Sequence, residues 1–266
     1  MTTLKDLMDL RGRRALITGG AGHIARAIGE TFAEMGADLL LVDRPGVDTE
    51  AVADGLRREW NIDADAFACD LERPEDRARL VEEVSTAGGL DIIVNNAAFV
   101  GTTNLEGWVT DFAHQTVETW RRAIEVNLTA AFDLAKGFAP LLRASKGGSI
   151  ISIASTYGLY GPDYRLYEGT QMGNPAAYAA SKGGLIQLTR WLATTLAPQV
   201  RVNAISPGGV FRNQPESFVE RYVARTPLRR MAHEDDFRGA AAYLASDASR
   251  YVTGQILQVD GGWGVW

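Results

Sequence analysis

The 266-residue sequence has few residues that could form a disulfide or a structural metal site: one cysteine, Cys69, and three histidines. A lone cysteine excludes a disulfide within the chain. The histidines, at positions 23, 114 and 233, lack the spacing of metal ligands, so we expect no metal site. A chain of this length can bury roughly 70–75% of its unfolded surface, so it needs no disulfide or metal ion to stabilise the fold. We therefore expect an ordinary apolar core that includes Cys69.

The sequence also lacks an excess of basic residues and a long apolar run. Its 27 lysines and arginines face 33 acidic residues, which gives a net charge of −6. Nucleic acids and anionic membranes bind basic surfaces, so neither is an expected partner. There is no apolar signal region at the start and no run of about 18 apolar residues. These absences favour a cytoplasmic protein.

A strand, a glycine turn, a helix and a second strand are predicted within the first fifty residues. Residues 14–18 form a short apolar run with strand character, Gly19–Gly22 follow, and residues 38–43 form a buried strand that ends in Asp43. This βαβ context is typical of dinucleotide binding, with the pyrophosphate at the helix N-terminus. Asp43 could accept hydrogen bonds from ribose hydroxyls and would repel a 2′-phosphate. NAD is therefore favoured over NADP, although Arg44 weakens that preference. A glycine turn without a ligand is the alternative.

Strands and helices keep alternating along the rest of the chain. Helices are predicted at 49–60, 74–87, 116–143, 176–197 and 234–246, and strands at 64–69, 91–95, 149–154, 200–205 and 255–259. Residues 211–233 have the composition of a variable polar region. Repeated βα units predict a parallel sheet with helices on both faces, and ligands bind beyond the carboxyl ends of its strands. With no linker in sight, we expect a single domain over residues 1–266.

The segment from Ser155 to Lys182 carries the residues best suited to proton transfer. Tyr178 and Lys182 are four residues apart in a predicted helix, so they point to one side. A phenol has an ordinary pKa of about 10, and a nearby ammonium should lower it. The Ser155 hydroxyl could hold a substrate oxygen, which would complete a proton-transfer site. Alternatively, Tyr178 is a surface tyrosine, and Ser155 caps a turn while Ser152 or Thr156 acts instead.

In this order, the motifs resemble the single-domain branch of the short-chain dehydrogenase/reductase family from Leu10 to about Gly262. The resemblance rests on residues 18–25, Asp70-Leu71, residues 95–98, Asn127, Ser155, Tyr178-Ala-Ala-Ser-Lys182, Pro207-Gly208 and residues 259–262. It implies a Rossmann-type doubly wound parallel sheet of about seven strands. It also implies reversible hydride transfer between a nicotinamide cofactor and an alcohol or carbonyl, in a homotetramer or homodimer.

The resemblance further implies a role for each site residue. Tyr178 is the general acid in reduction and the general base in oxidation, and Ser155 orients the substrate oxygen. Lys182 holds the nicotinamide ribose and lowers the pKa of Tyr178, while Asn127 positions a water for proton relay. The expected cofactor contacts are Gly19, His23, Ile24, Asp43, Asp70, Leu71, Asn96, Tyr178, Lys182, Pro207 and Val210.

The sequence departs from the family pattern at three motifs, one of which is the fourth-strand motif, where Ala98 replaces the usual glycine. His23 and Ala25 stand where the glycine motif usually has glycine, and we expect the Ala25 methyl near the pyrophosphate. Phe211 follows Val210 where many members have a threonine that helps to hold the carboxamide.

The connection between Ser155 and Tyr178 is longer than is usual in the family, because of residues 161–174. A loop anchored between two catalytic residues should lie over the substrate site and set specificity. It predicts a small polar substrate, hydroxylated or anionic, with Arg165 as a candidate contact; a surface loop without substrate contact is the alternative. A second addition at residues 100–115, with Trp108 and Phe112, is predicted to form another wall of the site.

The amino-acid sequence of residues 161–174 and 208–215 resembles that of a subgroup found in bacterial surface-sugar pathways, including nonulosonate synthesis. The leading hypothesis is thus an oxidoreductase acting on a sugar-like substrate. The alternatives are a cofactor-binding sensor or scaffold without turnover, and a dehydratase or epimerase that retains NAD.

The C-terminal tail ends in two large aromatic residues, Trp263 and Trp266. Exposed tryptophans are unfavourable in a monomer, so we expect burial against a neighbouring subunit. Packing on the protein's own domain is the alternative.

Overall fold

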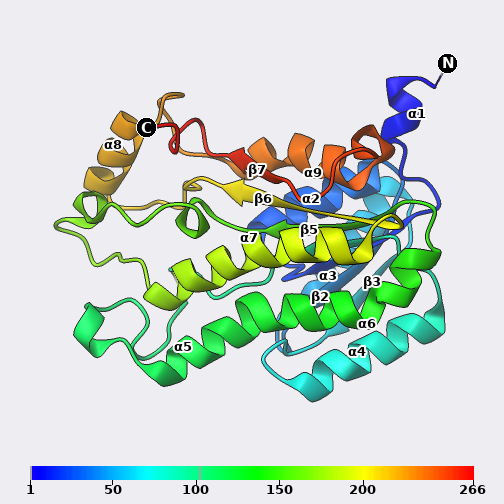
Figure 1. The fold of residues 1–266 in the computed structure, drawn as a ribbon, viewed down its shortest axis with the longest axis horizontal. Coiled ribbons are helices and arrows are strands. Elements are labelled where there is room, and N and C mark those ends of the chain that lie inside the picture. Colours follow the sequence, from blue (N-terminus) through cyan, green and yellow to red (C-terminus); the bar gives the residue numbers. More distant parts are fainter. Residues whose placement is uncertain (1, 102) are drawn as a thin grey trace.

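The centre of the molecule is a seven-stranded parallel sheet (Figure 1). The computed structural model describes residues 2–101 and 103–266. The strands lie in the order β3-β2-β1-β4-β5-β6-β7, and every neighbouring pair is parallel. Their bounds are β1 (Arg14–Thr18), β2 (Asp38–Asp43), β3 (Ala64–Ala68), β4 (Ile92–Asn95), β5 (Gly148–Ile153), β6 (Val200–Pro207) and β7 (Ile256–Val259). The prediction of a Rossmann-type sheet of about seven strands is confirmed.

Helices cover both faces of this sheet, as predicted. Their bounds are α1 (Leu4–Met8), α2 (His23–Glu34), α3 (Thr49–Trp60), α4 (Pro74–Ala87), α5 (Val117–Ile124), α6 (Ala130–Ala144), α7 (Ala176–Leu196), α8 (Glu216–Arg225) and α9 (Arg238–Ala245). The order of the strands reverses between β1 and β4. In doubly wound sheets ligands bind in the crevice beside such a reversal, at the carboxyl ends of the strands.

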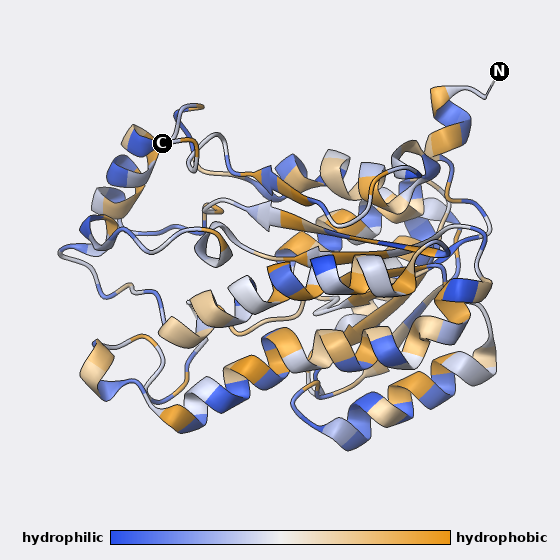
Figure 2. Cartoon of the chain, in the orientation of Figure 1, coloured by the Kyte–Doolittle hydropathy of each residue, from blue (hydrophilic) through white to orange (hydrophobic). Residues whose placement is uncertain are grey.

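The core consists of two apolar layers, because successive side chains of a strand point to opposite faces. In β2, Leu39 and Leu41 pack with Phe32 of α2 in the first layer, while Leu40 and Val42 belong to the second, with side chains of α4, α6 and α7. The central strands are correspondingly hydrophobic along most of their length (Figure 2). None of the helices in the described part of the chain is long and apolar enough to cross a membrane.

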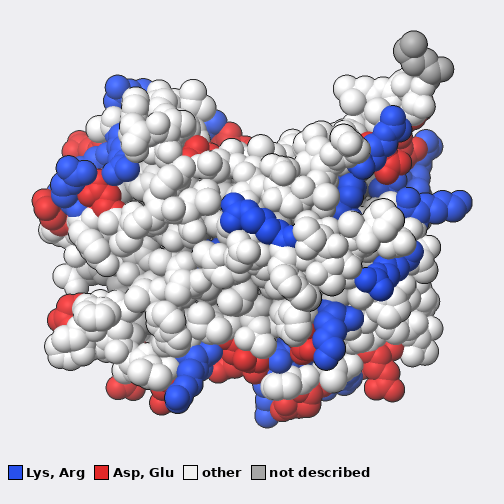
Figure 3. All heavy atoms as spheres, in the orientation of Figure 1, with Lys and Arg blue, Asp and Glu red and all other residues white. Residues whose placement is uncertain are grey.

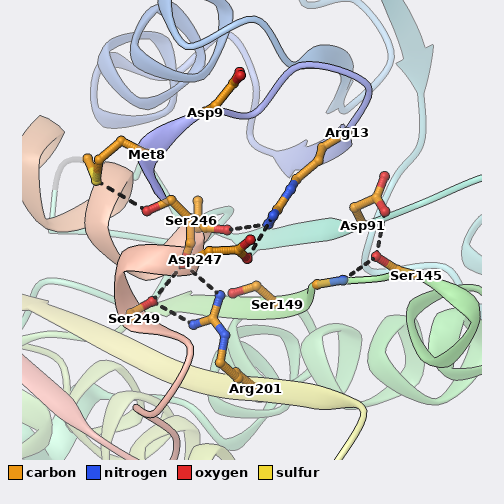
Figure 4. Close-up of polar contacts among 12 residues, drawn as sticks. Met8, Asp9, Arg13, Asp91, Ser145, Ser149, Arg201, Ser246, Asp247 and Ser249 are labelled. Carbon is orange, nitrogen blue, oxygen red and sulfur yellow. Dashed lines mark hydrogen bonds and ion pairs between the residues drawn. The ribbon is translucent and has the colours of Figure 1, made fainter. Parts of the chain in front are cut away.

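A polar network ties the chain together at the amino ends of the strands (Figure 4). Arg13, just before β1, pairs with Asp247 at 2.7 Å. Arg201, near the start of β6, donates to the Leu244 carbonyl at 2.9 Å and the Ser249 hydroxyl at 2.7 Å. Burial lowers the pKa of Arg201 to about 10. The network fastens the end of α9 to the edge of the sheet opposite to the carboxyl ends of its strands.

Three segments differ from the prediction. The helix expected over 116–143 is two helices, α5 and α6, joined by a π-helical turn at Glu125–Thr129. The polar region expected at 211–233 contains α8, whose Phe218 and Tyr222 are buried. The helix expected at 234–246 begins as a 3-10 turn at Glu234–Phe237 before α9.

Candidate active site

The turn after β1 has the geometry of a phosphate cradle. Gly19 has φ +64°, a backbone conformation that favours glycine. A Cβ there would also lie 3.0 Å from the Ala97 Cα, so both the backbone and the available space disfavour a side chain. Gly22 is the N-cap of α2, and among the described residues no side chain caps that helix. The first amides of α2 are therefore free to bind an anion, and the residues present fit the pyrophosphate of a dinucleotide.

Asp43 lies beside this turn, at the carboxyl end of β2. Its Oδ2 accepts from the Ala21 N–H at 3.1 Å and its Oδ1 from the Arg44 N–H at 2.8 Å. The second strand thus brings a carboxylate to the glycine turn. This is the arrangement in which an acidic residue accepts from ribose hydroxyls.

The two departures in the glycine motif occupy different environments. The His23 side chain is exposed, with its Nδ1 4.0 Å from a carboxylate oxygen of Glu234. Ala25 is fully buried in the core layer formed with Ile28 and Phe32. The expectation that the Ala25 methyl stands near the pyrophosphate is therefore wrong, since the helix turns it toward the sheet. Ile24 packs partly buried against the same layer.

The other residues predicted to bind cofactor lie at the carboxyl ends of β3, β4 and β6. After β3, the Asp70 N–H donates to Asp76 and the Leu71 carbonyl accepts from Arg77. Pro207 ends β6, and Val210 forms an isolated bridge to Ala232.

Asn96, after β4, holds the glycine turn through its side chain. Its Nδ2 donates to the carbonyls of Thr18 at 3.0 Å and Gly19 at 3.3 Å. Its backbone N–H donates to the Thr18 hydroxyl at 3.0 Å. The sequence suggested Asn96 only as a cofactor contact, and the structure adds a structural role for its side-chain amide.

Ser155, Tyr178 and Lys182 come together beyond the carboxyl end of β5. Ser155 directly follows that strand, and its hydroxyl accepts from the Tyr157 N–H at 3.2 Å. Helix α7 supplies Tyr178 and Lys182, with the Lys182 Nζ 5.8 Å from the centre of the Tyr178 ring. That Nζ donates to the Ile153 carbonyl at 2.6 Å, inside the protein. The grouping predicted from sequence is therefore present in the fold.

The protonation of this cluster differs from the expectation that Lys182 lowers the pKa of Tyr178. Burial raises the pKa of Tyr178, and a hydrogen bond with Ser155 opposes this only in part. Burial also lowers the pKa of Lys182 to about 8. Both shifts arise because desolvation disfavours the charged form of each group. Tyr178 thus holds its proton at neutral pH, as a general acid must.

Asn127 is buried in the π-helical turn and joins two parts of the site. Its Oδ1 accepts from the Phe99 N–H at 2.7 Å, and its Nδ2 donates to the Ser181 hydroxyl at 3.0 Å. Ser181 in turn donates to the Tyr178 carbonyl at 2.8 Å. Asn127 therefore connects the segment after β4 with the turn of α7 that carries Tyr178.

Arg77 of α4 forms ion pairs with residues in and just after the same π-helical turn. This side chain is almost completely buried and pairs with Glu125 and Asp133, each at 2.8 Å. Glu125 is the first residue of the turn and Asp133 lies in the first turn of α6. The pairing fixes the point at which α5 gives way to α6.

The long connection between Ser155 and Tyr178 includes a 3-10 turn at Tyr164–Tyr167. The Tyr167 hydroxyl lies 2.5 Å from that of Tyr157, two residues after Ser155. Arg165, the predicted substrate contact, has an 80% exposed side chain that pairs with Asp163 at 2.8 Å. Sequence reasoning did not single out Tyr157, because nothing local indicates its contact with Tyr167.

The second addition, at residues 100–115, packs against Tyr178 through Trp108. Trp108 is buried in a cluster with Ala177 and Tyr178, and its indole N–H donates to the Val100 carbonyl at 2.8 Å. Phe112 is 85% exposed and takes no part in that cluster. Residue 102 of this addition lies outside the described residues.

Trp263 of the tail packs on its own chain, against the expectation that a neighbouring subunit buries it. Trp263 is 1% exposed and lies among aromatic rings that include Tyr157 and Tyr222. The Arg225 guanidinium stands 4.2 Å from the centre of its ring. Trp266 remains 73% exposed.

Comparisons with known proteins agree with this architecture. Residues 19–264 match the family model described as enoyl-(acyl carrier protein) reductase. An uncharacterised oxidoreductase of Mycobacterium tuberculosis is 36% identical over 97% of this chain and 94% of its own length. The galactitol 2-dehydrogenase (L-tagatose-forming) of Cereibacter sphaeroides is 34% identical over 98% of this chain and 99% of its own.

Solved structures show the same fold with either nicotinamide cofactor. An NAD+-bound xylitol dehydrogenase superimposes with a TM-score of 0.84 at 28% identity, over 95% of this chain and 99% of its own. A gluconate 5-dehydrogenase of Burkholderia cenocepacia, in complex with NADP and tartrate, gives a TM-score of 0.85 at 28% identity, over 99% and 100%. Because the family match spans nearly the whole chain, this protein belongs to the short-chain dehydrogenase/reductase family of NAD(P)-dependent oxidoreductases.

Proposed function

We propose that the protein transfers a hydride between a nicotinamide cofactor and a hydroxyl or carbonyl group of a small, sugar-like substrate. The observation that carries this proposal is the cluster of Ser155, Tyr178 and Lys182 at the edge of the sheet that also bears the glycine turn. The similarity to a galactitol dehydrogenase and a xylitol dehydrogenase supports a polyhydroxylated substrate.

Tyr178 is the proposed proton carrier. In reduction its phenol donates a proton to the carbonyl oxygen, and in oxidation the phenolate removes one from the hydroxyl. Its raised pKa keeps the phenol protonated and ready to donate at neutral pH. Ser155, which hydrogen-bonds Tyr178, orients the substrate oxygen. Asn127 positions a water that relays protons between Lys182 and solvent.

The cofactor supplies the hydride acceptor or donor when it is bound. The free amides of α2 after Gly22 would hold its pyrophosphate, and Lys182 would hold the nicotinamide ribose. Asp43 would accept from the hydroxyls of the adenosine ribose and disfavour a 2′-phosphate, so we propose NAD rather than NADP. His23, Ile24, Asp70, Leu71, Asn96, Pro207 and Val210 complete the proposed cofactor contacts.

A homotetramer or homodimer is the proposed assembly. Large apolar side chains are exposed on the helices that flank the sheet: Trp120 of α5 at 40%, Phe132 of α6 at 42% and Trp191 of α7 at 53%. The face that carries these helices has few charged side chains across its middle (Figure 3). A face with few charges across its middle and several exposed aromatic residues suits contact with a second copy.

Initial rates with a panel of sugars, alditols and keto sugars test the function. Each substrate is offered with NADH or NADPH, or with the oxidised forms, and absorbance of the reduced cofactor is followed. We expect turnover with the NAD pair to exceed that with the NADP pair.

Tyr178→Phe removes only the phenolic oxygen, and Tyr164→Phe is the matched control because Tyr164 is exposed. We expect kcat to fall at least a thousandfold in the first variant and to stay unchanged in the control. Full activity of Tyr178→Phe would overturn the assignment. Tightly retained cofactor without net oxidation or reduction would instead indicate a dehydratase or epimerase.

A further inference from the structure

Three polar side chains from separate elements meet at the start of α2. His23 is the first residue of that helix, directly after the glycine turn. Its Nδ1 lies 4.0 Å from Oε1 of Glu234, in the 3-10 turn before α9, and the Arg212 guanidinium pairs with the same oxygen. Arg212 belongs to the segment that follows β6. One carboxylate oxygen therefore joins that segment to the mouth of the phosphate cradle.

The backbone that carries Arg212 is fixed beside the 3-10 turn. Val210 forms an isolated bridge to Ala232, and the Phe211 N–H donates to the Ala232 carbonyl at 2.9 Å. The Gln214 side chain accepts from the Arg212 N–H and donates to the Val210 carbonyl, both at 2.7 Å. Val210 and Ala232 also pack against the core layer to which the start of α2 belongs. Rotation of its side chain is therefore enough to redirect the Arg212 guanidinium.

The neighbouring acid of the same turn has a local partner instead. Asp236 pairs with Arg230 at 2.6 Å and accepts from the His233 N–H at 2.8 Å. Both partners come from the residues directly before the turn, so this pair fastens the turn to its own segment. Glu234 differs, because its arginine comes from the segment after β6.

The position of Glu234 is unfavourable for a site that binds an anion. The free amides of α2 would bring a pyrophosphate next to His23, and a carboxylate there repels it unless a cation neutralises the carboxylate. Arg212 supplies that cation, and a guanidinium is well suited to bind phosphate oxygens. The Arg212 and Glu234 side chains are 31% and 27% exposed, so their ion pair contributes little to stability and is readily exchanged.

We propose that Arg212 binds the pyrophosphate of the cofactor and that Glu234 competes with the pyrophosphate for this guanidinium. When the cofactor binds, Arg212 turns from the carboxylate to a phosphate oxygen, and Glu234 stays beside the imidazole of His23. Glu234 thereby keeps the arginine near the cradle in the free protein and weakens cofactor binding. This inference rests on the proposed function and names a further residue of its cofactor site.

Equilibrium binding of three ligands isolates the phosphate contact. The ligands are the reduced cofactor that the wild type prefers, ADP-ribose, which has the pyrophosphate but no nicotinamide, and adenosine, which has neither. Cofactor fluorescence measures the first Kd, and competition with the cofactor measures the others.

Two variants of the ion pair should change these affinities in opposite directions. Arg212→Met should raise Kd for the cofactor and for ADP-ribose about tenfold or more, and leave adenosine within about twofold, because a charge-assisted hydrogen bond to phosphate is lost. Glu234→Gln should lower both Kd values about threefold to tenfold, because the competing carboxylate is gone. Arg230→Met is the matched control and should bind as the wild type does, since Arg230 pairs with Asp236.

The opposite signs separate phosphate binding from a structural role, because both variants break the same ion pair. Weaker binding in both variants would overturn the inference, as would an unchanged affinity in either. Loss of adenosine binding in Arg212→Met, or weakening confined to the complete cofactor, would overturn it too. Each of these outcomes leaves the proposed function intact. Failure of the wild type to bind NADH or NADPH would overturn the proposed function, and the inference with it.

Discussion

Lys182 is a buried cation whose removal should make the folded protein more stable while abolishing activity. Burial lowers its pKa from 10.5 to about 8. Below pH 8 the lysine is protonated in both the folded and the unfolded chain, so burying the charge costs roughly 3 kcal/mol. Lys182→Met removes that cost. It also removes the hydrogen bond to the Ile153 carbonyl, which is worth roughly 1 kcal/mol.

We therefore expect Lys182→Met to raise the free energy of unfolding at pH 7 by about 2 kcal/mol, or the melting temperature by about 4 °C. Between about pH 8 and 10.5 the folded lysine is neutral while the unfolded one still binds a proton. Wild-type stability then rises with pH, and the advantage of the variant should shrink.

Urea unfolding at pH 7 and pH 10, followed by circular dichroism, measures both effects. Lys136→Met is the control, because Lys136 is exposed on α6 and its loss should change stability by no more than about 0.5 kcal/mol. A Lys182→Met protein that is less stable than the wild type at pH 7 would refute the reasoning. An advantage that stays constant up to pH 10 would refute the assignment of the effect to the lysine charge.

Two further predictions concern buried groups outside the reacting cluster. Arg77→Met should lower the free energy of unfolding, measured by urea titration, by about 2 kcal/mol, because Glu125 and Asp133 lose their shared partner. Arg79→Met, at an exposed position of the same helix, is the control. A loss of stability in Arg77→Met no larger than that in Arg79→Met would contradict this prediction. Cys69 should react with a thiol reagent at pH 8 only on unfolding, because burial raises its pKa to about 12; fast labelling of the native protein would show that the thiol is accessible.

Local sequence patterns predicted most of this fold. Glycine turns, apolar runs and helical stripes placed all seven strands to within about two residues, since those patterns depend on near neighbours in the chain. The same patterns brought Ser155, Tyr178 and Lys182 to one edge of the sheet. Asp43 was placed beside the glycine turn for the same reason.

What the sequence did not reveal depends on distant parts of the chain. Helix α8 buries Phe218 and Tyr222 against the tail residue Trp263, which no local pattern of 211–233 indicates. The raised pKa of Tyr178 follows from its burial, whereas spacing alone suggested the effect of a nearby ammonium. Nothing in the neighbouring sequence predicts that the side-chain amide of Asn174 is buried.

The π-helical turn at Glu125–Thr129 matters for anyone who redesigns this protein. An α-helix rotates by about 100° per residue, and a π-turn accommodates one residue more than a regular turn. Deleting a single residue there would allow a continuous helix and would turn the Asn127 side chain away from Phe99 and Ser181. Libraries that vary chain length should therefore leave this turn intact. The sequences of helices α5 and α6 can then be redesigned separately, because the turn keeps the two helices in a fixed relative position.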